Sequence, residues 1–236
     1  MSIIKFIRPT SLTFISRQEV APTTYTFSFK PNAPLTWHAG QHGMIELVSA
    51  KGKIMRRMFS LSSAPSEDIV SITTRYIDHA ASDFKKSLWA LKSGVKAKLR
   101  GPVGPMYVRN PKQHNIFIAN GIGITPFRSV LVEATANKRD LHGTLIYENR
   151  NDTVIFKEEI EKLSTNLKHF EVNLITEPEK LTEETIRLSV PDLGSSMFYL
   201  AGSPSTIESY KKILSQLGVK RSQIRNDAFR GYKFES

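Results

Sequence analysis

Ile-Phe-Ile-Ala-Asn-Gly-Ile-Gly-Ile-Thr-Pro, residues 116–126, predicts a buried strand, a glycine turn and the start of a helix. The first four apolar residues do not alternate with polar ones, which is typical of a strand covered on both faces in a parallel sheet. Gly121 and Gly123 allow a positive φ or a close approach to a ligand, Thr125 suits a helix N-cap, and Pro126 suits the first helical position. Free N–H groups at such a turn can bind an anion, typically a diphosphate. With only two glycines, an ordinary strand-to-helix turn remains an alternative for this stretch alone.

The rest of the C-terminal half alternates between strands and helices. Predicted strands cover residues 116–119, 144–148, 170–175, 197–201 and 223–226, and predicted helices cover 126–137, 154–165, 182–189 and 204–217. This alternation predicts a five-stranded parallel sheet with helices on both faces. Ligands bind at the carboxyl ends of the strands in such folds, which is where Gly121–Thr125 and Gly202-Ser203-Pro204 fall.

The first hundred residues indicate a different architecture. Short predicted strands cover residues 12–20, 23–29, 41–48, 69–75, 96–99 and 106–108, which predicts a six-stranded antiparallel barrel. One helix interrupts them: Ser82 is its N-cap, Phe84, Leu88 and Leu91 share a face, and Gly94 ends it. Because the segment Arg109–Asn115 is polar and lacks periodicity, we expect two domains, residues 1–110 and 111–236.

The composition limits the class of protein. Of 236 residues, 40% are apolar and 23% are charged, as in a globular protein with a substantial core. No apolar run approaches membrane-spanning length, and the N-terminal apolar stretch is too short for a signal peptide. We therefore expect a cytoplasmic protein without a membrane partner. Zero cysteines exclude disulfides, thiolate zinc sites and an iron–sulfur cluster of its own.

The net charge of +11 is spread along the chain. It favours either a basic patch for an acidic partner or a merely solvated surface, and no nucleic-acid motif accompanies it. The histidines show no metal-ligand spacing, so we expect surface or packing residues and no metal site. They are His38, His42, His79, His114, His142 and His169.

The stretch Arg57–Pro65 is the second informative one. On a strand, Arg57, Phe59 and Leu61 point one way, and Ser60 points the other way together with Met58 and Ser62. A guanidinium near an aromatic ring and hydroxyls suits a ligand that has both a phosphate and a flat ring. The alternative is a barrel strand with one buried phenylalanine and a solvent-facing arginine.

Arg57-x-Phe59-Ser60-x-x-Ser63 resembles the Arg-x-Tyr-Ser-x-x-Ser flavin motif of the ferredoxin–NADP⁺ reductase family. Further motifs match in order: His38-Ala39-Gly40-Gln41, Thr73-Thr74-Arg75, Ser82-x-Phe84-Lys85-x-x-Leu88, Gly101-Pro102-x-Gly104, the stretch 116–126, Ala201-Gly202-Ser203-Pro204 and Asp227-Ala228-Phe229-x-Gly231-Tyr232. The resemblance implies an FAD-binding β-barrel domain in residues 1–110 and an NAD(P)-binding α/β domain in 111–236. FAD is favoured over FMN.

The resemblance also implies roles for individual residues. Arg57 would bind the flavin diphosphate with Thr74 and Ser82, Phe59 would stack on the isoalloxazine, and Phe229 would cover its other face. Ser60, near flavin N5, and Asp227, an acid close to the nicotinamide, are the implied catalytic residues. The implied nicotinamide-nucleotide contacts are Gly121, Ile122, Gly123, Thr125, Pro126, Arg150, Ala201, Gly202 and Ser203.

The sequence departs from the family pattern at four positions. Phe59 replaces a tyrosine, Asn120 replaces the first glycine of its loop but can adopt positive φ, Ala201 replaces a cysteine, and Asp227 is one methylene shorter than glutamate. These changes leave open a protein that kept the fold and lost efficient redox chemistry.

The resemblance implies hydride transfer from NAD(P)H to flavin N5 and single-electron delivery to ferredoxin or a similar small acidic carrier. Reduction of free flavin, ferric complexes or quinones is an alternative, and so is a non-catalytic redox sensor or subunit. Arg150 favours NADPH slightly, although Glu148 precedes it where a carboxylate would favour NADH.

Overall fold

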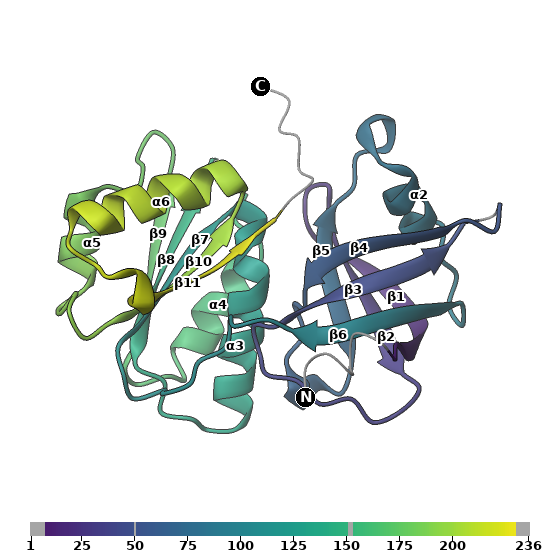
Figure 1. Ribbon diagram of the computed structural model, residues 1–236, viewed down its shortest axis with the longest axis horizontal. Helices are drawn as coiled ribbons and strands as arrows, with labels where there is room; N and C mark the ends of the chain where they lie inside the picture. Colours follow the sequence, from purple (N-terminus) through teal and green to yellow (C-terminus); the bar gives the residue numbers. More distant parts are fainter. Residues whose placement is uncertain (1–7, 50, 151–152, 230–236) are drawn as a thin grey trace.

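The computed structural model describes residues 8–49, 51–150 and 153–229. Two β-sheets lie side by side, an antiparallel one built from the first half of the chain and a parallel one built from the second (Figure 1). The antiparallel sheet ends at Val103 and the parallel sheet begins at Asn115. The predicted domain division at residue 110 falls in this connection and stays a prediction.

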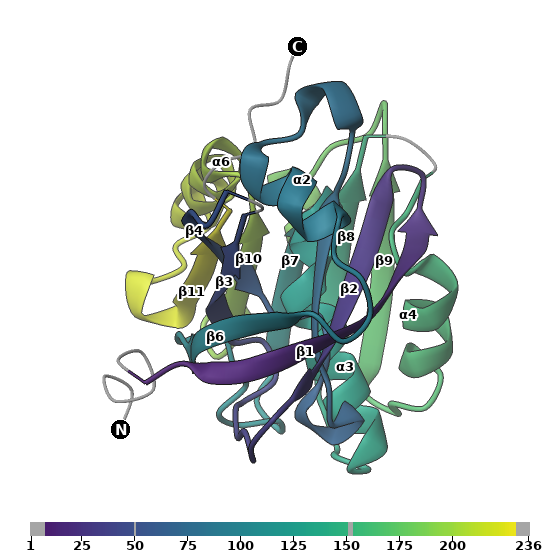
Figure 2. The same cartoon turned by 90° about the vertical axis from the view of Figure 1, so that its right-hand side faces the viewer.

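The antiparallel sheet is an open barrel of six strands, as the sequence predicts. Its strands are β1 (Thr10–Ala21), β2 (Thr24–Pro31), β3 (His42–Val48), β4 (Ile54–Ser60), β5 (Val70–Arg75) and β6 (Lys96–Val103), in the spatial order β4-β3-β6-β1-β2-β5. Figure 2 views the barrel with β1 and β6 side by side, in front of the parallel sheet. Alternate residues of the strands, among them Phe27, Phe29 and Ile45, fill its interior.

One predicted barrel strand is wrong. Residues 106–108 form no strand, and the sixth strand is β4, which pairs antiparallel with β3. Met106 is buried because it packs in the core shared with the parallel sheet, together with Val108. The strand signal of β4 is weak because Arg56 and Arg57 break the alternation on an edge strand whose outer side faces solvent.

Helix α2 (Asp83–Trp89) begins at the predicted Ser82, whose hydroxyl accepts the amide of Lys85 at 3.4 Å. It ends earlier than predicted, at Trp89 rather than at Gly94. The Trp89 ring stacks on Tyr76 at 4.2 Å, and the Trp89 carbonyl accepts a hydrogen bond from Arg17. Because these barrel contacts hold Trp89, they compete with continuation of the helix.

The second half of the chain forms the predicted five-stranded parallel sheet. Its strands are β7 (Asn115–Asn120), β8 (Gly143–Asn149), β9 (Phe170–Thr176), β10 (Met197–Gly202) and β11 (Ile224–Ala228), in the order β11-β10-β7-β8-β9. Its helices are α3 (Thr125–Ala136), α4 (Lys157–Ser164), α5 (Glu183–Ser189) and α6 (Pro204–Gln216). Phe117 and Ala119 point to the face covered by α3 and α4, whereas Ile116 and Ile118 point to the face covered by α5 and α6. Both faces are covered, which is why the central strands β7 and β10 are apolar runs.

Helix α3 also joins the two halves. Arg128 donates to Glu67 at 2.9 Å, to Glu159 at 2.6 Å and to the Ser62 carbonyl at 2.7 Å. Burial alone would lower the pKa of Arg128, but the hydrogen bonds to the two carboxylates raise it. Ser129 adds a hydrogen bond to the Ser63 carbonyl at 2.7 Å. These contacts hold the carboxyl ends of the parallel strands beside the barrel.

Within the described residues, no helix is both long and apolar enough to cross a bilayer.

Candidate functional site

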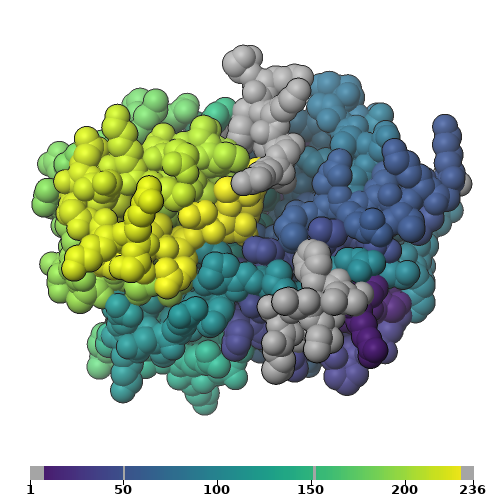
Figure 3. Space-filling view, in the orientation of Figure 1, coloured from purple at the N-terminus to yellow at the C-terminus, as the bar shows by residue number. Residues whose placement is uncertain are grey.

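A cavity of about 330 Å³ lies where the end of β4 meets the carboxyl ends of the parallel strands. Figure 3 shows the seam between the two halves, with the β11 segment in yellow facing the barrel in blue. Nine residues singled out from the sequence line the cavity: Arg57, Phe59, Ser60, Thr74, Ser82, Ile122, Thr125, Asp227 and Phe229. Met58, Thr73, Phe84, Lys85 and Ala228 complete the lining. The volume is within the usual range for a small-molecule site.

The barrel wall of the cavity combines aromatic rings with a cation. The Phe59 and Phe84 ring centroids are 5.8 Å apart, and the Arg57 guanidinium lies 6.0 Å from the Phe84 centroid. Phe59 and Ser60 both line the cavity, at the end of the edge strand β4. This wall suits a flat ring that carries a nearby negative charge.

Lys85 is a cation of the cavity that was not among the site residues selected from the sequence. It lies in the first turn of α2, and burial lowers its pKa, with a further lowering from the guanidinium of Arg75. Lys85 and Arg57 both line the cavity, and their positive charges make it attractive to an anion. The signal was present in the Ser82-x-Phe84-Lys85 motif, where helical spacing turns Lys85 to the same side as the N-cap.

Ser60 and Asp227 meet across the seam. Ser60 Oγ donates a hydrogen bond of 2.6 Å to Asp227 Oδ2, although 167 positions separate the two residues. Asp227 is largely buried, with 12% of its side chain exposed. The two residues expected to be catalytic are thus in direct contact, one at the end of β4 and one near the end of β11.

His42 is a third member of this group and was expected to be a surface or packing residue. Its Nδ1 lies 3.6 Å from Asp227 Oδ2 and is buried without a hydrogen bond. A Cβ on Gly104 would lie 2.7 Å from Cε1 of the His42 ring, and the φ of Gly104 is +107°. Gly104 therefore leaves space for His42 beside Asp227. The register of the barrel, in which His42 pairs with Ser60, explains why the sequence alone did not reveal it.

The glycine turn after β7 differs in detail from its prediction. Gly121–Ile124 forms a short 3-10 turn, and Thr125 is the first residue of α3 rather than its N-cap. The Thr125 amide bonds back to the Ile122 carbonyl, so the turn itself supplies the helix entry. The positive φ belongs to Gly121 at +52°, whereas Asn120 is extended at −125°. Pro126 follows in the first turn of α3.

Gly123 brings this turn against β10. A Cβ on Gly123 would lie 2.1 Å from the Ala201 carbonyl oxygen, so only glycine fits. Ala201 is fully buried and pairs in register with Asp227 of β11. Two of the departures from the family pattern therefore lie side by side. Gly202 follows Ala201, and Ser203 caps α6 by accepting the Thr206 amide at 3.1 Å.

The end of β8 carries the residues expected to select the nucleotide. Glu148 accepts a hydrogen bond from the Tyr210 hydroxyl of α6. Burial raises the pKa of Tyr210, and the adjacent carboxylate raises it further. Arg150 is exposed and follows directly, outside the cavity lining. Gly121, Gly123, Pro126, Ala201, Gly202 and Ser203 likewise flank the cavity rather than line it. Gly231 and Tyr232 of the closing motif lie outside the described residues.

Comparison with known proteins is consistent with this geometry. Residues 117–212 match the oxidoreductase NAD-binding domain family. NADH-cytochrome b5 reductase 1 of Coccidioides immitis is 28% identical over 222 residues, which cover 85% of this chain and 71% of that protein. Across the curated relatives it matches, the chain spans between 51% and 71% of their length.

Two solved structures share the whole fold. The flavohem-like FAD/NAD binding domain of nitric oxide dioxygenase from Vibrio cholerae superposes with a TM-score of 0.79 at 20% identity, covering 93% of this chain and 98% of that one. Ferredoxin–NADP⁺ reductase from Plasmodium falciparum superposes with a TM-score of 0.76 at 17% identity, covering 94% and 96%. At these identities the similarity is one of fold.

Proposed function

We propose that this chain is a flavoprotein reductase similar to the ferredoxin–NADP⁺ reductases, which takes a hydride from NAD(P)H onto a bound flavin and passes the electrons to a separate acceptor. The single observation that carries the proposal is the 2.6 Å hydrogen bond from Ser60 to Asp227, because it joins the flavin motif to the nucleotide sheet inside one cavity. Bringing two reactants together in one orientation is the main contribution of such a site.

The residues of the cavity fit a flavin nucleotide. Phe59 and Phe84 offer flat apolar surface, while Arg57 and Lys85 offer positive charge for a phosphate. FAD is the flavin that the Vibrio cholerae neighbour is described as binding. Bound there, a flavin would supply the chemistry, accepting a hydride at N5 and releasing electrons one at a time.

Ser60, Asp227 and His42 would organise the reacting end of the cavity. Because Ser60 directs its hydroxyl hydrogen to Asp227, the lone pairs of Oγ remain available to accept a hydrogen bond from a ring N–H. Asp227 would hold that orientation, and His42 would hold Asp227. Phe229, whose amide donates to the Gly202 carbonyl at 2.9 Å, would cover the ring from the nucleotide side. Thr74 and Ser82 would complete the phosphate contacts.

The nicotinamide nucleotide would bind along the carboxyl edge of the parallel sheet. Gly121, Ile122, Gly123, Thr125 and Pro126 would contact its diphosphate at the start of α3. Gly202 and Ser203 would contact it at the start of α6, and the small side chain of Ala201 would admit the nicotinamide. Because Tyr210 engages Glu148, we infer that Arg150 favours the 2′-phosphate of NADPH.

Anaerobic titration of the flavin-loaded chain with NADH and NADPH in parallel, followed by its visible spectrum, tests the proposal. We expect NADPH to reduce the flavin at the lower concentration. Asp227→Asn and Ser60→Ala should slow reduction by about 10–100-fold, the equivalent of one hydrogen bond to a charged group, about 1.5–3 kcal/mol. Ser66→Ala removes an exposed hydroxyl from the segment that follows β4, and it should leave the rate unchanged.

Two outcomes would contradict the proposal. A purified chain that takes up no flavin on reconstitution excludes a flavoprotein. A flavin that stays oxidised for minutes under both nucleotides supports the second candidate, a non-catalytic redox sensor or subunit. The adjacent Ala201 and Asp227 are the observation that favours that candidate.

For the acceptor we propose a small acidic electron carrier, such as ferredoxin. The net charge of +11 supports this choice, because a basic protein attracts an acidic partner. Reduction of an acidic carrier should slow steeply as ionic strength rises, because salt screens the attraction. A rate on ferricyanide or free flavin that exceeds the carrier rate at every salt concentration would identify a small-molecule reductase instead.

A further inference from the structure

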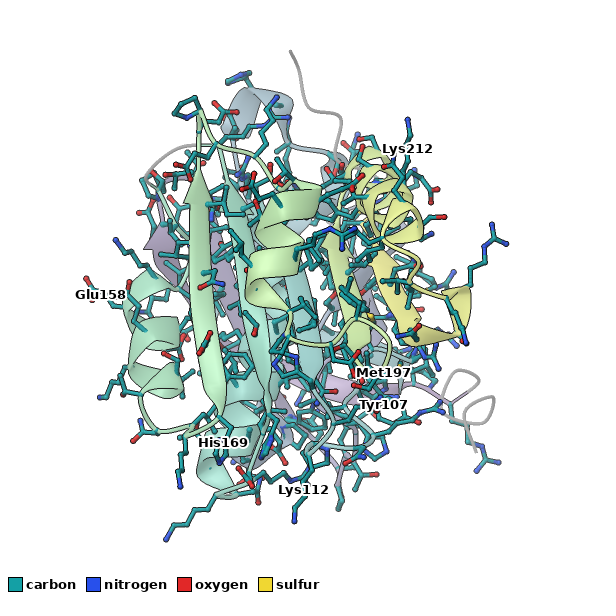
Figure 4. All side chains as sticks on the ribbon, turned by 90° about the vertical axis from the view of Figure 1, so that its left-hand side faces the viewer. Tyr107, Lys112, Glu158, His169, Met197 and Lys212 are labelled. Carbon is teal, nitrogen blue, oxygen red and sulfur yellow. The ribbon has the colours of Figure 1, made fainter. Side chains whose placement is uncertain are left out.

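Three histidines lie at the amino edge of the parallel sheet, opposite the carboxyl edge that forms the candidate site. His114, His142 and His169 directly precede β7, β8 and β9. Asn115 pairs with Gly143, and Gly143 pairs with Phe170, so the three histidines occupy neighbouring register positions. Figure 4 shows His169 at the start of β9, at the same end as Lys112. The parallel register brings together residues that are 27 to 55 positions apart in sequence.

Two of these histidines form a compact group with Asp140, which lies in the connection between α3 and β8. One ligand atom from each of Asp140, His142 and His169 lies within 4.8 Å of the other two. Asp140 Oδ2 is 3.1 Å from His142 Nε2, and Asp140 Oδ1 is 4.0 Å from His169 Nε2. The His142 and His169 ring centroids are 4.3 Å apart at an interplanar angle of 38°.

The contacts inside the group leave His142 unsatisfied. Its Nε2 is buried and forms no hydrogen bond of acceptable geometry, although Asp140 Oδ2 is 3.1 Å away. A buried ring nitrogen without a partner is costly in a folded protein. A cation between the ring and the carboxylate would bind the lone pair of the nitrogen and an oxygen of Asp140 at the same time.

We propose that Asp140, His142 and His169 bind one divalent transition-metal ion, with Zn²⁺ or Ni²⁺ as the best matches. Imidazole nitrogens with one carboxylate are preferred ligands of these ions, and water would complete the coordination. Tetrahedral metal–ligand distances near 2.1 Å place the ligand atoms about 3.4 Å apart, so the 4.0 Å contact must shorten slightly and the 3.1 Å contact must lengthen slightly. Asp140 and His169 are exposed and can make that adjustment.

A bound ion would tie the segment before β8 to the segment before β9. The site is at the sheet edge remote from the flavin cavity, so the proposal is independent of the proposed function. The positive charge of Lys112 disfavours cation binding, because it interacts with the carboxylate of Asp140. Removing that charge with Lys112→Gln should tighten binding by about twofold, a small effect because both groups are exposed.

The test is a calorimetric titration of the tag-free, flavin-loaded full chain with ZnSO₄ and with NiSO₄. We expect one ion per chain, an affinity at least about 100-fold weaker in the His142→Gln/His169→Gln double variant, and an intermediate loss in Asp140→Asn. His79→Gln, an exposed histidine on the barrel, is the matched control and should bind as the unmodified chain does. Flavin content and NAD(P)H oxidation should be unchanged in every variant.

Two further readouts remain informative if the double variant folds poorly. Saturating Zn²⁺ should raise the melting temperature of the unmodified chain, since only the folded state assembles the ligands. X-ray absorption of the zinc-loaded chain should show two imidazoles in the coordination sphere. Absence of saturable binding, a coordination sphere without imidazole, or equal affinity in the folded double variant would overturn the proposal.

Discussion

At the residue scale, the surroundings of Lys85 disfavour its charged form. Burial and the neighbouring Arg75 both lower its pKa, and the negative charge of a phosphate placed in the cavity would oppose both effects. Lys85→Met should therefore weaken flavin binding by about 10–100-fold, the loss expected for one hydrogen bond to a charged group. Fluorescence titration of the apoprotein with FAD measures the change.

Lys86 is the matched control for this prediction. It is the next residue of α2, is exposed, and does not line the cavity. Lys86→Met should bind FAD as the unmodified chain does. Equal losses in the two variants would mean that the general positive charge of the surface, rather than Lys85 itself, attracts the flavin.

A second residue-scale prediction concerns Gly104. Gly104→Ala should strain a backbone with φ of +107° and displace the His42 ring, which would stand 2.7 Å from the new methyl carbon. Strain of this kind costs about 1–3 kcal/mol. We expect lower stability in urea and, because His42 supports Asp227, slower flavin reduction by NADPH.

Gly94 separates these two effects. Its φ is +91°, but no atom lies within 4 Å of an added Cβ. Gly94→Ala should reproduce the loss of stability without slowing flavin reduction. If Gly104→Ala destabilises the protein but reduces its flavin at the normal rate, His42 has no part in positioning Asp227.

At the element scale, strand β3 buries a carboxylate among three basic side chains, of which Lys98 is the most distant at 3.8 Å. Glu46 is 4% exposed and lies 2.7 Å from Arg56 of β4 and 3.3 Å from Arg100 of β6. Burial alone would raise the pKa of Glu46, but the hydrogen bonds from these guanidiniums lower it. Since the folded pKa is depressed, the stabilisation is complete above the unfolded value of about 4.3 and is lost as the pH falls through the folded pKa.

Glu46→Gln should therefore flatten the loss of stability on acidification below about pH 4.5. Urea unfolding between neutral pH and the acid transition measures this slope. Glu158→Gln, which changes an exposed residue of α4, should leave the slope unchanged. A Glu46→Gln profile parallel to that of the unmodified chain would show that the three strands gain nothing from this carboxylate.

Element-scale sequence patterns differ in how much they reveal. Each strand of the parallel sheet lies within about two residues of its prediction. For the central strands β7 and β10 the reason is burial on both faces, which leaves an apolar run. Strand β4 has one solvated face and two arginines, so its sequence lacks a clear strand pattern. Residues 106–108 were predicted as the sixth strand instead, but they connect the two sheets and pack in the core beside the parallel one. The 3-10 turn Gly121–Ile124 was also invisible, because its geometry follows from the close packing of Gly123 on β10.

At the scale of the whole molecule, Arg128 holds the two halves together from α3. It joins Glu67 near the barrel to Glu159 of α4, with 15% of its own side chain exposed. Arg128→Met should destabilise the protein by about 2–3 kcal/mol, below the 3–5 kcal/mol typical of a fully buried pair because the carboxylates are partly solvated. Arg187→Met on the exposed side of α5 is the control.

The same variant tests whether the halves unfold together. We expect flavin release and loss of helical circular dichroism to coincide in the unmodified chain and to separate in Arg128→Met, because the cavity is formed by both halves. Coincident transitions in the variant would show that Arg128 contributes stability without coupling the halves.

The sequence alone determined that the first half of the chain forms an antiparallel barrel and the second half a parallel sheet. It also identified Arg57–Ser60 and Gly121–Thr125 as the informative motifs. These features depend on local periodicity, on the special conformations of glycine and proline, and on side-chain chemistry that residue identity alone reveals. The tertiary structure alone decided the contact of Ser60 with Asp227 and the approach of His42. It also decided the grouping of Asp140, His142 and His169. These arrangements depend on strand register and on the packing of one sheet against the other, which bring distant residues together without leaving a pattern in the sequence.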